Sequence, residues 1–168
     1  MPRVIDRAQA IAGLSHHPCL VCALVADPSA LVVHESQHCV VMLPRLAIRW
    51  GHVMIVLRVH VERFTAVEPA AWSQAGELSL AVARVLETEL MAVRVYVASL
   101  GTARRDLPMT SPHLHLHAIP IYDKDDKPAA VLTWEHGVTV AAEHEWQALR
   151  ERLKAALAAP RSLIEQES

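Results

Sequence analysis

The sequence predicts an α+β fold, in which helices pack on a sheet of short antiparallel strands. Short apolar segments rich in valine are separated by polar turns, a pattern typical of β-hairpins. Two longer segments, 65–91 and 141–157, instead repeat apolar residues at helical spacing. Short strands, hairpins and helices mixed along one chain are typical of the α+β class.

The composition is that of one globular domain spanning residues 1–168. Hydrophobic residues make up 52% of the 168 residues, which is enough for a core. The net charge of −2, with no basic block, argues against general nucleic-acid binding. No apolar run is long enough for a transmembrane helix, and the charged N-terminus is unlike a signal peptide. Three cysteines, an odd number, fit a reducing cytoplasmic setting.

The N-terminal half predicts a short helix followed by three strands. Residues 1–14 have amphipathic spacing and end near Gly13. The segments 30–34 and 39–43 flank a polar turn and read as a hairpin. Residues 52–57 form the next apolar run and predict a third strand.

A long helix is predicted to separate this hairpin region from the strands that follow. Thr65 and Glu68 have capping-box spacing, with Pro69 in the first turn, so the helix is expected to begin at Thr65. It should end near Met91. After it we expect a strand at 93–99, another at 129–134 and a C-terminal helix at 141–157.

Three histidines alternate with apolar residues at His113, His115 and His117. In a β-strand this spacing places all three side chains on one face. Random placement of the histidines would give only about 0.05 such triples. A solvent-facing, histidine-rich edge strand is the alternative. Because imidazole near neutral pH can act as nucleophile, proton carrier or metal ligand, the pattern predicts a functional cluster.

A CxxC pair lies at Cys19 and Cys22. Such a pair is half of a metal site or a redox couple. The redox interpretation requires a βαβ context that the surrounding sequence lacks, and a zinc site requires two further ligands from elsewhere. Cys39 lies in an apolar segment and is expected in the core.

The segment His113–Ile119 matches the signature His-φ-His-φ-His-φ-φ, where φ is apolar. A second landmark is Gly51-His52 followed by an apolar strand, with His60 eight positions after His52. Together with the CxxC pair, these motifs make residues 15–122 resemble the histidine triad (HIT) family. The resemblance implies an antiparallel sheet of about five strands and a long helix between the two landmarks. A C-terminal helix would belong to an extension, 123–168, that covers the cleft or extends a dimer.

The resemblance also implies an enzyme that acts on nucleotides. Family members cleave at the α-phosphate through a nucleotidyl-histidine intermediate, as phosphoramidases, dinucleoside polyphosphate hydrolases or transferases. By position, His115 is the nucleophile, His117 contacts phosphate oxygens or assists the leaving group, and His52 supports the cluster. A nucleotide would be the small-molecule partner, and a homodimer with joined sheets is expected.

In zinc-containing members of the family, the metal is held by the CxxC pair and two histidines. Carried over, that set is Cys19, Cys22, His60 and His113, a closed Cys₂His₂ arrangement suited to structural zinc. The alternative is a zinc-free site with two free thiols. Hydrolysis by the metal itself is not expected, because no ligand position is left for water.

The chain departs from the family where the substrate is held. Many members have an Asp that binds the ribose hydroxyls, and Pro44 stands at that position. Many have Gly-Gln-Ser ahead of the triad, where this chain has residues 108–110 with Met109 in place of the Gln. The departures favour a rival hypothesis, a catalytically weakened, zinc-stabilised dimeric nucleotide-binding or regulatory protein. A sugar-phosphate nucleotidyltransferase is a weaker alternative, since that branch usually lacks the last triad histidine and His117 is intact.

Four residues remain as candidate substrate ligands. Thr110 keeps a hydroxyl ahead of the triad, and Ser99 begins the segment that replaces the family's Asn-Gly. Arg104 and Arg105 are either replacement phosphate contacts or part of a solvated loop.

Overall fold

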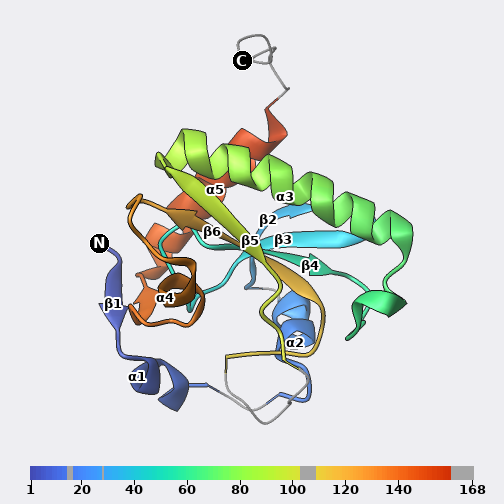
Figure 1. The fold of residues 1–168 in the computed structure, drawn as a ribbon, viewed down its shortest axis with the longest axis horizontal. Helices are drawn as coiled ribbons and strands as arrows, with labels where there is room; N and C mark the ends of the chain where they lie inside the picture. The colour runs from blue at the N-terminus through green and yellow to red at the C-terminus, as the bar shows by residue number, and fades with distance from the viewer. Residues whose placement is uncertain (15–16, 28, 103–108, 160–168) are drawn as a thin grey trace.

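The centre of the molecule is a five-stranded antiparallel sheet in the order β2-β3-β4-β6-β5 (Figure 1). The structure is a computed structural model that describes residues 1–14, 17–27, 29–102 and 109–159. The strands are β2 (Leu31–Glu35), β3 (Cys39–Leu43), β4 (Val53–Leu57), β5 (Arg94–Ala98) and β6 (His115–Ile121). The predicted α+β class and the antiparallel sheet are confirmed.

The central strands are buried on both faces, and their register decides which face each side chain occupies. Ile55 of β4 pairs with Leu116 of β6, and both belong to the main hydrophobic core. Met54 pairs with His117 in the same ladder. Because successive residues of a strand point to opposite faces, His117 lies on the face away from that core.

Two helices, α3 (Pro69–Leu90) and α5 (Glu143–Ala158), cover the core face of the sheet (Figure 1). The N-cap of α3 is Glu68, and Thr65 lies in a separate 3₁₀ turn, η1 (Phe64–Ala66), so the predicted start at Thr65 is wrong. Proline disfavours the helical conformation in the residue before it, and Glu68 is accordingly extended, with ψ of 133°. The helix therefore begins at Pro69, whose fixed φ suits the first helical position.

The short helix α2 (Leu20–Ala26) packs on the opposite face of the sheet. Its buried Val21 forms a second apolar cluster with Met42, Met54 and Val56. This packing fixes the start of α2, where both cysteines of the CxxC pair lie, against the face of the sheet that carries His117.

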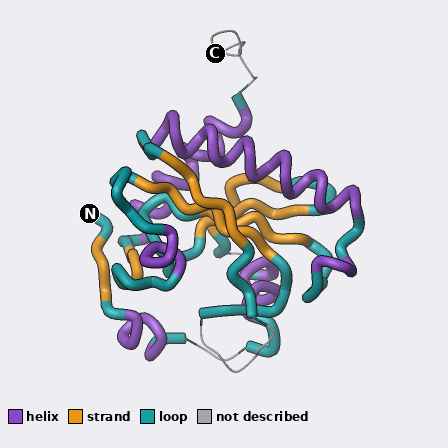
Figure 2. The backbone as a smooth tube through the Cα atoms, viewed as in Figure 1, coloured by secondary structure: helices purple, strands orange, loops and turns teal. Residues whose placement is uncertain are grey.

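A second, two-stranded sheet at one side of the molecule joins the N-terminal segment to the strand that precedes α5. β1 (Arg3–Ile5) pairs antiparallel with β7 (Val138–Val140). The helices α1 (Arg7–Ala12) and α4 (Pro128–Leu132) flank this pair (Figure 2). The predicted strand at 129–134 is wrong, because Pro128 at the first helical position starts a helical turn there. Among the described residues, no helix is long and apolar enough to cross a membrane.

Candidate functional site

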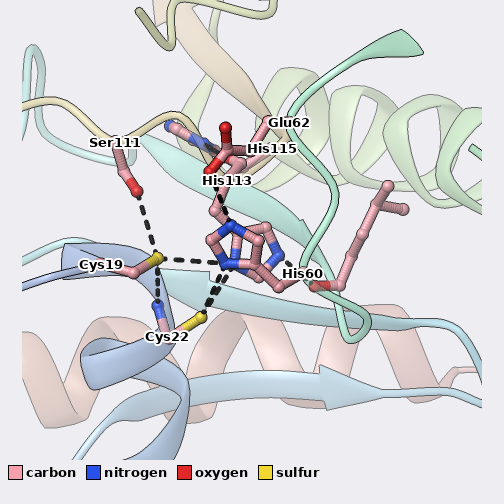
Figure 3. Close-up of polar contacts among 8 residues, drawn as sticks. Cys19, Cys22, His60, Glu62, Ser111, His113 and His115 are labelled. Carbon is pink, nitrogen blue, oxygen red and sulfur yellow. Dashed lines mark hydrogen bonds and ion pairs between the residues drawn. The ribbon is translucent and has the colours of Figure 1, made fainter. Parts of the chain in front are cut away.

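Two cysteines and two histidines converge where α2, the end of β4 and the start of β6 meet (Figure 3). Cys19 is the N-cap of α2 and Cys22 lies in its first turn. His60 follows β4, and His113 precedes β6. One ligand atom from each of these four residues lies within 4.8 Å of all the others.

The spacing of these atoms matches that of a tetrahedral metal shell. The Cys22 Sγ lies 3.2 Å from His60 Nδ1 and 3.3 Å from His113 Nδ1, and the Cys19 Sγ lies 3.8 Å from His113 Nδ1. Zinc at about 2.3 Å from sulfur and about 2.0–2.1 Å from nitrogen separates tetrahedral ligands by roughly 3.3–3.8 Å. The donor set, with these three distances and all four atoms within 4.8 Å of one another, is compatible with a zinc ion.

Both imidazoles of this cluster have the tautomer that metal binding requires. The His113 Nε2–H donates to the Leu57 carbonyl at 2.8 Å, and the His60 Nε2–H donates to the Glu62 carboxylate at 3.0 Å. Each Nδ1 is then left with its lone pair facing the thiols. Hydrogen bonds of this kind orient histidine ligands and raise their basicity in known metal sites.

The Cys19 sulfur is prepared to carry negative charge. Burial alone would raise its pKa, but hydrogen bonds from the Ser111 hydroxyl, at 3.4 Å, and the Cys22 N–H, at 3.3 Å, lower it overall. Burial and the neighbouring Cys19 raise the pKa of Cys22 to about 11. Cys19 is therefore the more acidic thiol of the pair, and a bound cation would hold both sulfurs as thiolates.

His115 lies beside this cluster and has one free ring nitrogen. Its Nδ1–H donates to the backbone carbonyl of His113 at 2.7 Å, which leaves Nε2 unprotonated. Burial lowers the pKa of His115, although the same hydrogen bond opposes that effect. His115 is therefore a neutral imidazole with a lone pair on Nε2.

His52 and His117 form a hydrogen-bonded chain that starts at the backbone. The Ile48 N–H donates to His52 Nδ1 at 3.2 Å, so the proton of His52 is on Nε2. That Nε2–H donates to His117 Nδ1 at 2.8 Å, so the proton of His117 is on Nε2. Burial lowers the pKa of His52 to about 3 and that of His117 to about 2, aided by the nearby imidazoles.

Two cavities adjoin at His115 and His117. The first, of about 240 Å³, is mostly apolar and reaches from the two histidines to α2 and Pro44. The second, of about 200 Å³, is more polar and reaches Arg7 of α1. Besides the two histidines, the walls of both cavities include Met109, Thr110 and Trp134. A ligand that spans both cavities would pass directly over the two imidazoles.

The HIT domain model matches residues 26–124 of the sequence, more than half of the chain. The chain belongs to the HIT family. No curated protein matches the sequence significantly.

Solved structures of HIT proteins share this fold. A zinc-bound histidine triad family protein from Mycobacterium smegmatis superposes with a TM-score of 0.62 at 20% identity, over 83% of this chain and 93% of that one. A hypothetical histidine triad nucleotide-binding protein from Sulfolobus tokodaii superposes with a TM-score of 0.64 at 14% sequence identity, over 83% of this chain and 91% of that one. The Plasmodium falciparum diadenosine triphosphate hydrolase, in complex with cyclomarin A, superposes with a TM-score of 0.60 at 11% sequence identity, over 77% of this chain and 76% of that one.

The HIT signature is not one continuous strand in this chain. β6 begins at His115, so His113 lies in the bend before the strand. Leu114 and Leu116 both belong to the main core, and the three histidines lie on the opposite side, as the alternation predicts. The bend turns the His113 ring toward the cysteines. The His60 and His113 rings are 4.8 Å apart, and the His115 and His117 rings are 4.7 Å apart.

The candidate substrate ligands differ in where they lie. Thr110 lines both cavities, and its buried hydroxyl has no hydrogen-bond partner among the residues that the structure describes. Ser99 is exposed and lines neither cavity. Arg104 and Arg105 fall in the segment 103–108, outside the described residues.

Several residues of the site were not identified from the sequence. Arg7 and Trp134 line the second cavity, yet they come from segments outside the HIT domain match, and no motif marks them. Ser111 and Glu62 orient ligands of the thiol–imidazole cluster. Glu62 stands two residues after His60, a spacing at which a carboxylate beside a candidate metal-binding histidine could have been noticed.

Proposed function

We propose that this protein is a HIT-type nucleotidyl hydrolase with His115 as nucleophile, and that Cys19, Cys22, His60 and His113 hold a structural zinc ion. One observation carries the catalytic part of the proposal. The two imidazoles between the cavities have complementary tautomers, with a lone pair on His115 Nε2 and a proton on His117 Nε2, and both tautomers follow from backbone contacts.

In the first step, the His115 Nε2 lone pair attacks the α-phosphorus of a bound nucleotide. The new P–N bond forms as the bond from phosphorus to the leaving group breaks, and the leaving group takes the bonding electron pair. His115 becomes a phosphorylated imidazolium, and its Nδ1–H stays bound to the His113 carbonyl, which stabilises the positive charge. In the second step, water attacks phosphorus and releases a proton to solvent, while the electron pair of the breaking P–N bond returns to His115 Nε2 and restores the neutral imidazole.

His117 and Thr110 act on the phosphate and the leaving group. The His117 Nε2–H is the donor available to a phosphate oxygen or to the leaving atom, because its Nδ1 is occupied by His52. The Thr110 hydroxyl, buried and without a partner, supplies a further donor. His52 lines the first cavity and donates to His117 Nδ1, and we assign it the role of positioning His117.

The apolar cavity suits the nucleoside. Its walls include Leu20, Leu24 and Met54, which offer van der Waals contact to a base but few specific hydrogen bonds. Pro44 lines the same cavity at the position where many family members carry the ribose-binding carboxylate. Recognition of the ribose hydroxyls is therefore expected to be weak, with little selectivity among bases.

The zinc ion would supply structural cross-linking. Four protein ligands complete a tetrahedral shell and leave no open position for substrate or water. The ion would tie α2 to the segments that carry His60 and His113, and so would fix the carbonyl that orients His115.

The proposal is tested by turnover and by trapping of the intermediate. Purified protein is incubated with adenosine 5′-phosphoramidate and with diadenosine triphosphate, and nucleotide products are separated chromatographically. We expect AMP from both substrates. When the reaction with ³²P-labelled substrate is quenched without acid, the protein should carry the label. The His115→Ala variant should show neither AMP formation nor labelled protein. The exposed His34 provides a control, since His34→Ala should retain both. Absence of turnover and of labelled wild-type protein would refute the hydrolase.

The replacement of polar groups in the cavity favours one alternative. Pro44 and Met109 present apolar atoms where family members bind ribose and phosphate. A catalytically weakened, zinc-stabilised nucleotide-binding or regulatory protein would keep nucleotide affinity without turnover. Calorimetric titration of AMP into the wild type and His115→Ala separates the two functions. A binding protein would keep its affinity for AMP in both proteins, and neither protein would be labelled by the ³²P substrate.

A further inference from the structure

The second cavity has side chains in its wall that the first cavity lacks. They are Arg7 of α1, Leu132 of α4, Leu100 and Thr102, whereas Trp134 lines both cavities. Arg7, Leu132 and Trp134 lie outside the HIT domain match at 26–124. Pairing of β1 with β7 brings these two segments together at one end of the cavity. One wall of this cavity is therefore formed by segments that precede and follow the HIT domain match.

Charge in this wall is positive and uncompensated. Among the described residues, Arg7 has no ion pair and no side-chain hydrogen bond, whereas Arg45, Arg49 and Arg58 each bind a carboxylate. A free guanidinium beside a cavity is a group that binds a phosphate in a two-pronged manner. The unpartnered Thr110 hydroxyl lines the same cavity and adds a second polar group.

The backbone is also held in an uncommon conformation at two wall positions. Met109 has a φ of 59° and Trp134 a φ of 62°, although neither is glycine. Bulky residues seldom adopt left-handed backbone, and such outliers cluster at ligand sites. Both side chains line both cavities, beside His115 and His117.

We propose that the second cavity is the leaving-group subsite, and that Arg7 makes it selective for leaving groups that carry a phosphate. The proposal rests on the nucleotidyl transfer to His115 proposed above. With the nucleoside in the apolar cavity and the α-phosphorus at His115, the group on the other side of the scissile bond enters the second cavity. Leu132 and Trp134 then contact the apolar or aromatic part of that group.

The substrate class that fits is the dinucleoside polyphosphate. As His115 Nε2 bonds to the α-phosphorus, the bond from that phosphorus to the bridging oxygen breaks and a nucleoside diphosphate leaves with the electron pair. The Arg7 guanidinium offsets the negative charge that develops on the departing phosphate. An amine that leaves from a phosphoramidate carries no such charge and gains nothing from Arg7.

The test compares two substrates that share a nucleoside and differ in leaving group. For Arg7→Ala we expect kcat/KM on diadenosine triphosphate to fall about 10- to 100-fold, the loss typical of a hydrogen bond to a charged group. The value for adenosine 5′-phosphoramidate should change by less than about twofold. Arg3→Ala is the matched control, since Arg3 is also exposed, lies four residues away and does not line the cavity. Equal losses on both substrates, or no loss on either, would overturn the proposal.

A binding measurement keeps this inference separate from the proposed catalysis. Inorganic pyrophosphate is titrated calorimetrically into wild type, Arg7→Ala and Arg3→Ala, with thermal melts to confirm folding. We expect affinity to weaken about tenfold or more in Arg7→Ala alone. If the wild type turns over neither substrate but binds pyrophosphate in a way that depends on Arg7, the proposed hydrolase activity is refuted while the proposed anion-binding subsite is supported. Equal pyrophosphate affinity in wild type and Arg7→Ala refutes the subsite whatever the catalytic result.

Discussion

Single backbone atoms decide the chemistry of the histidines. The carbonyl of His113 fixes the proton of His115, and the N–H of Ile48 fixes that of His52 and, through it, that of His117. A neutral imidazole can serve as nucleophile or as proton donor, and only the tautomer distinguishes these roles. The different functions proposed for His115 and His117 therefore arise from their partners rather than from their identical side chains.

The sequence could reveal which side chains gather here, but not these tautomers. Spacing identified His115 and His117 as strand neighbours, and the resemblance grouped the cysteines with His60. The partners that set the protonation are backbone groups of Ile48 and Leu57, which leave no trace in residue type. The resemblance did group His113 with the cysteines, but no sequence signal marks the bend that ends the strand pattern before His115.

The buried His52–His117 pair should make the protein less stable in mild acid. Both pKa values in the folded protein, about 3 and about 2, lie below the value of roughly 6.5 expected in the unfolded chain. Between these values the unfolded chain binds more protons, so the stability of the neutral pair is complete above about pH 6.5 and is lost as pH falls. The slope is about 1 kcal/mol per pH unit for each histidine.

Urea unfolding between pH 7.5 and 5 measures this effect. The double substitution His52→Gln and His117→Gln keeps polar side chains of similar length but cannot titrate, so its free energy of unfolding should depend less steeply on pH. His34→Gln, at an exposed position, should unfold with the wild-type pH dependence. A wild-type slope equal to that of the double variant would contradict the assignment.

The thiol–imidazole cluster joins elements that are distant in sequence. The start of α2 contributes Cys19 and Cys22, the end of β4 leads to His60, and the approach to β6 contributes His113. A metal ion here would hold α2 on the sheet. It would also fix the His113 carbonyl, the acceptor of the hydrogen bond that orients His115.

Removal of the metal should therefore lower stability and loosen His115 together. A ligand present at about 100 times its Kd stabilises a folded protein by about 3 kcal/mol, so a chelator should lower the melting temperature by several degrees. Elemental analysis should find about one zinc per chain in the wild type. Cys22→Ser should abolish both the zinc and the effect of the chelator, whereas Cys39→Ser lies outside the cluster and should retain both. Zinc-free wild-type protein that melts like the chelated sample would contradict the prediction.

Local sequence signals predicted the elements well where they agreed with tertiary packing. The long helix and the hairpin of β2 and β3 follow from periodicity. The start of α3 was misplaced because the apparent capping box at Thr65 competes with Pro69, which dictates the backbone of the residue before it. The segment 129–134 reads as a strand by its apolar residues, but Pro128 directs it into α4. Pairing of β1 with β7 joins segments more than 130 residues apart in the sequence, which periodicity within either segment cannot reveal.

The contact between β1 and β7 can be tested at Gly137. This residue has a φ of 84°, and a Cβ would lie 2.7 Å from the Ile5 carbonyl oxygen, a backbone atom. Gly137→Ala should lower the free energy of unfolding by about 1–2 kcal/mol or more, because left-handed backbone is costly with a side chain. In the exposed middle of α3, Gly76 has open space, so Gly76→Ala should stabilise by about 0.5–1 kcal/mol. Chemical denaturation of both variants decides the prediction, which fails if Gly137→Ala is neutral.

The whole molecule leaves one edge of its main sheet open. β2 at one edge packs against α5, whereas β5 at the other edge has β6 as its only strand partner among the described residues. An edge strand offers unpaired backbone groups to another chain, and β5 also exposes the apolar side chain of Val97, with Val93 just before the strand. A second copy paired at β5 would cover both. The homodimer implied by the family resemblance is therefore expected to form through this edge.

Light scattering after gel filtration tests that assembly. We expect wild type to elute as a dimer and Val97→Asp to shift toward monomer at micromolar concentration, because a carboxylate at the centre of the paired edge would face its counterpart in the other chain. Val59→Asp is the control, since Val59 is also exposed but lies after β4, away from this edge. A Val97→Asp protein that stays dimeric would place the interface elsewhere. The two active sites proposed here would then not be linked through a continuous sheet.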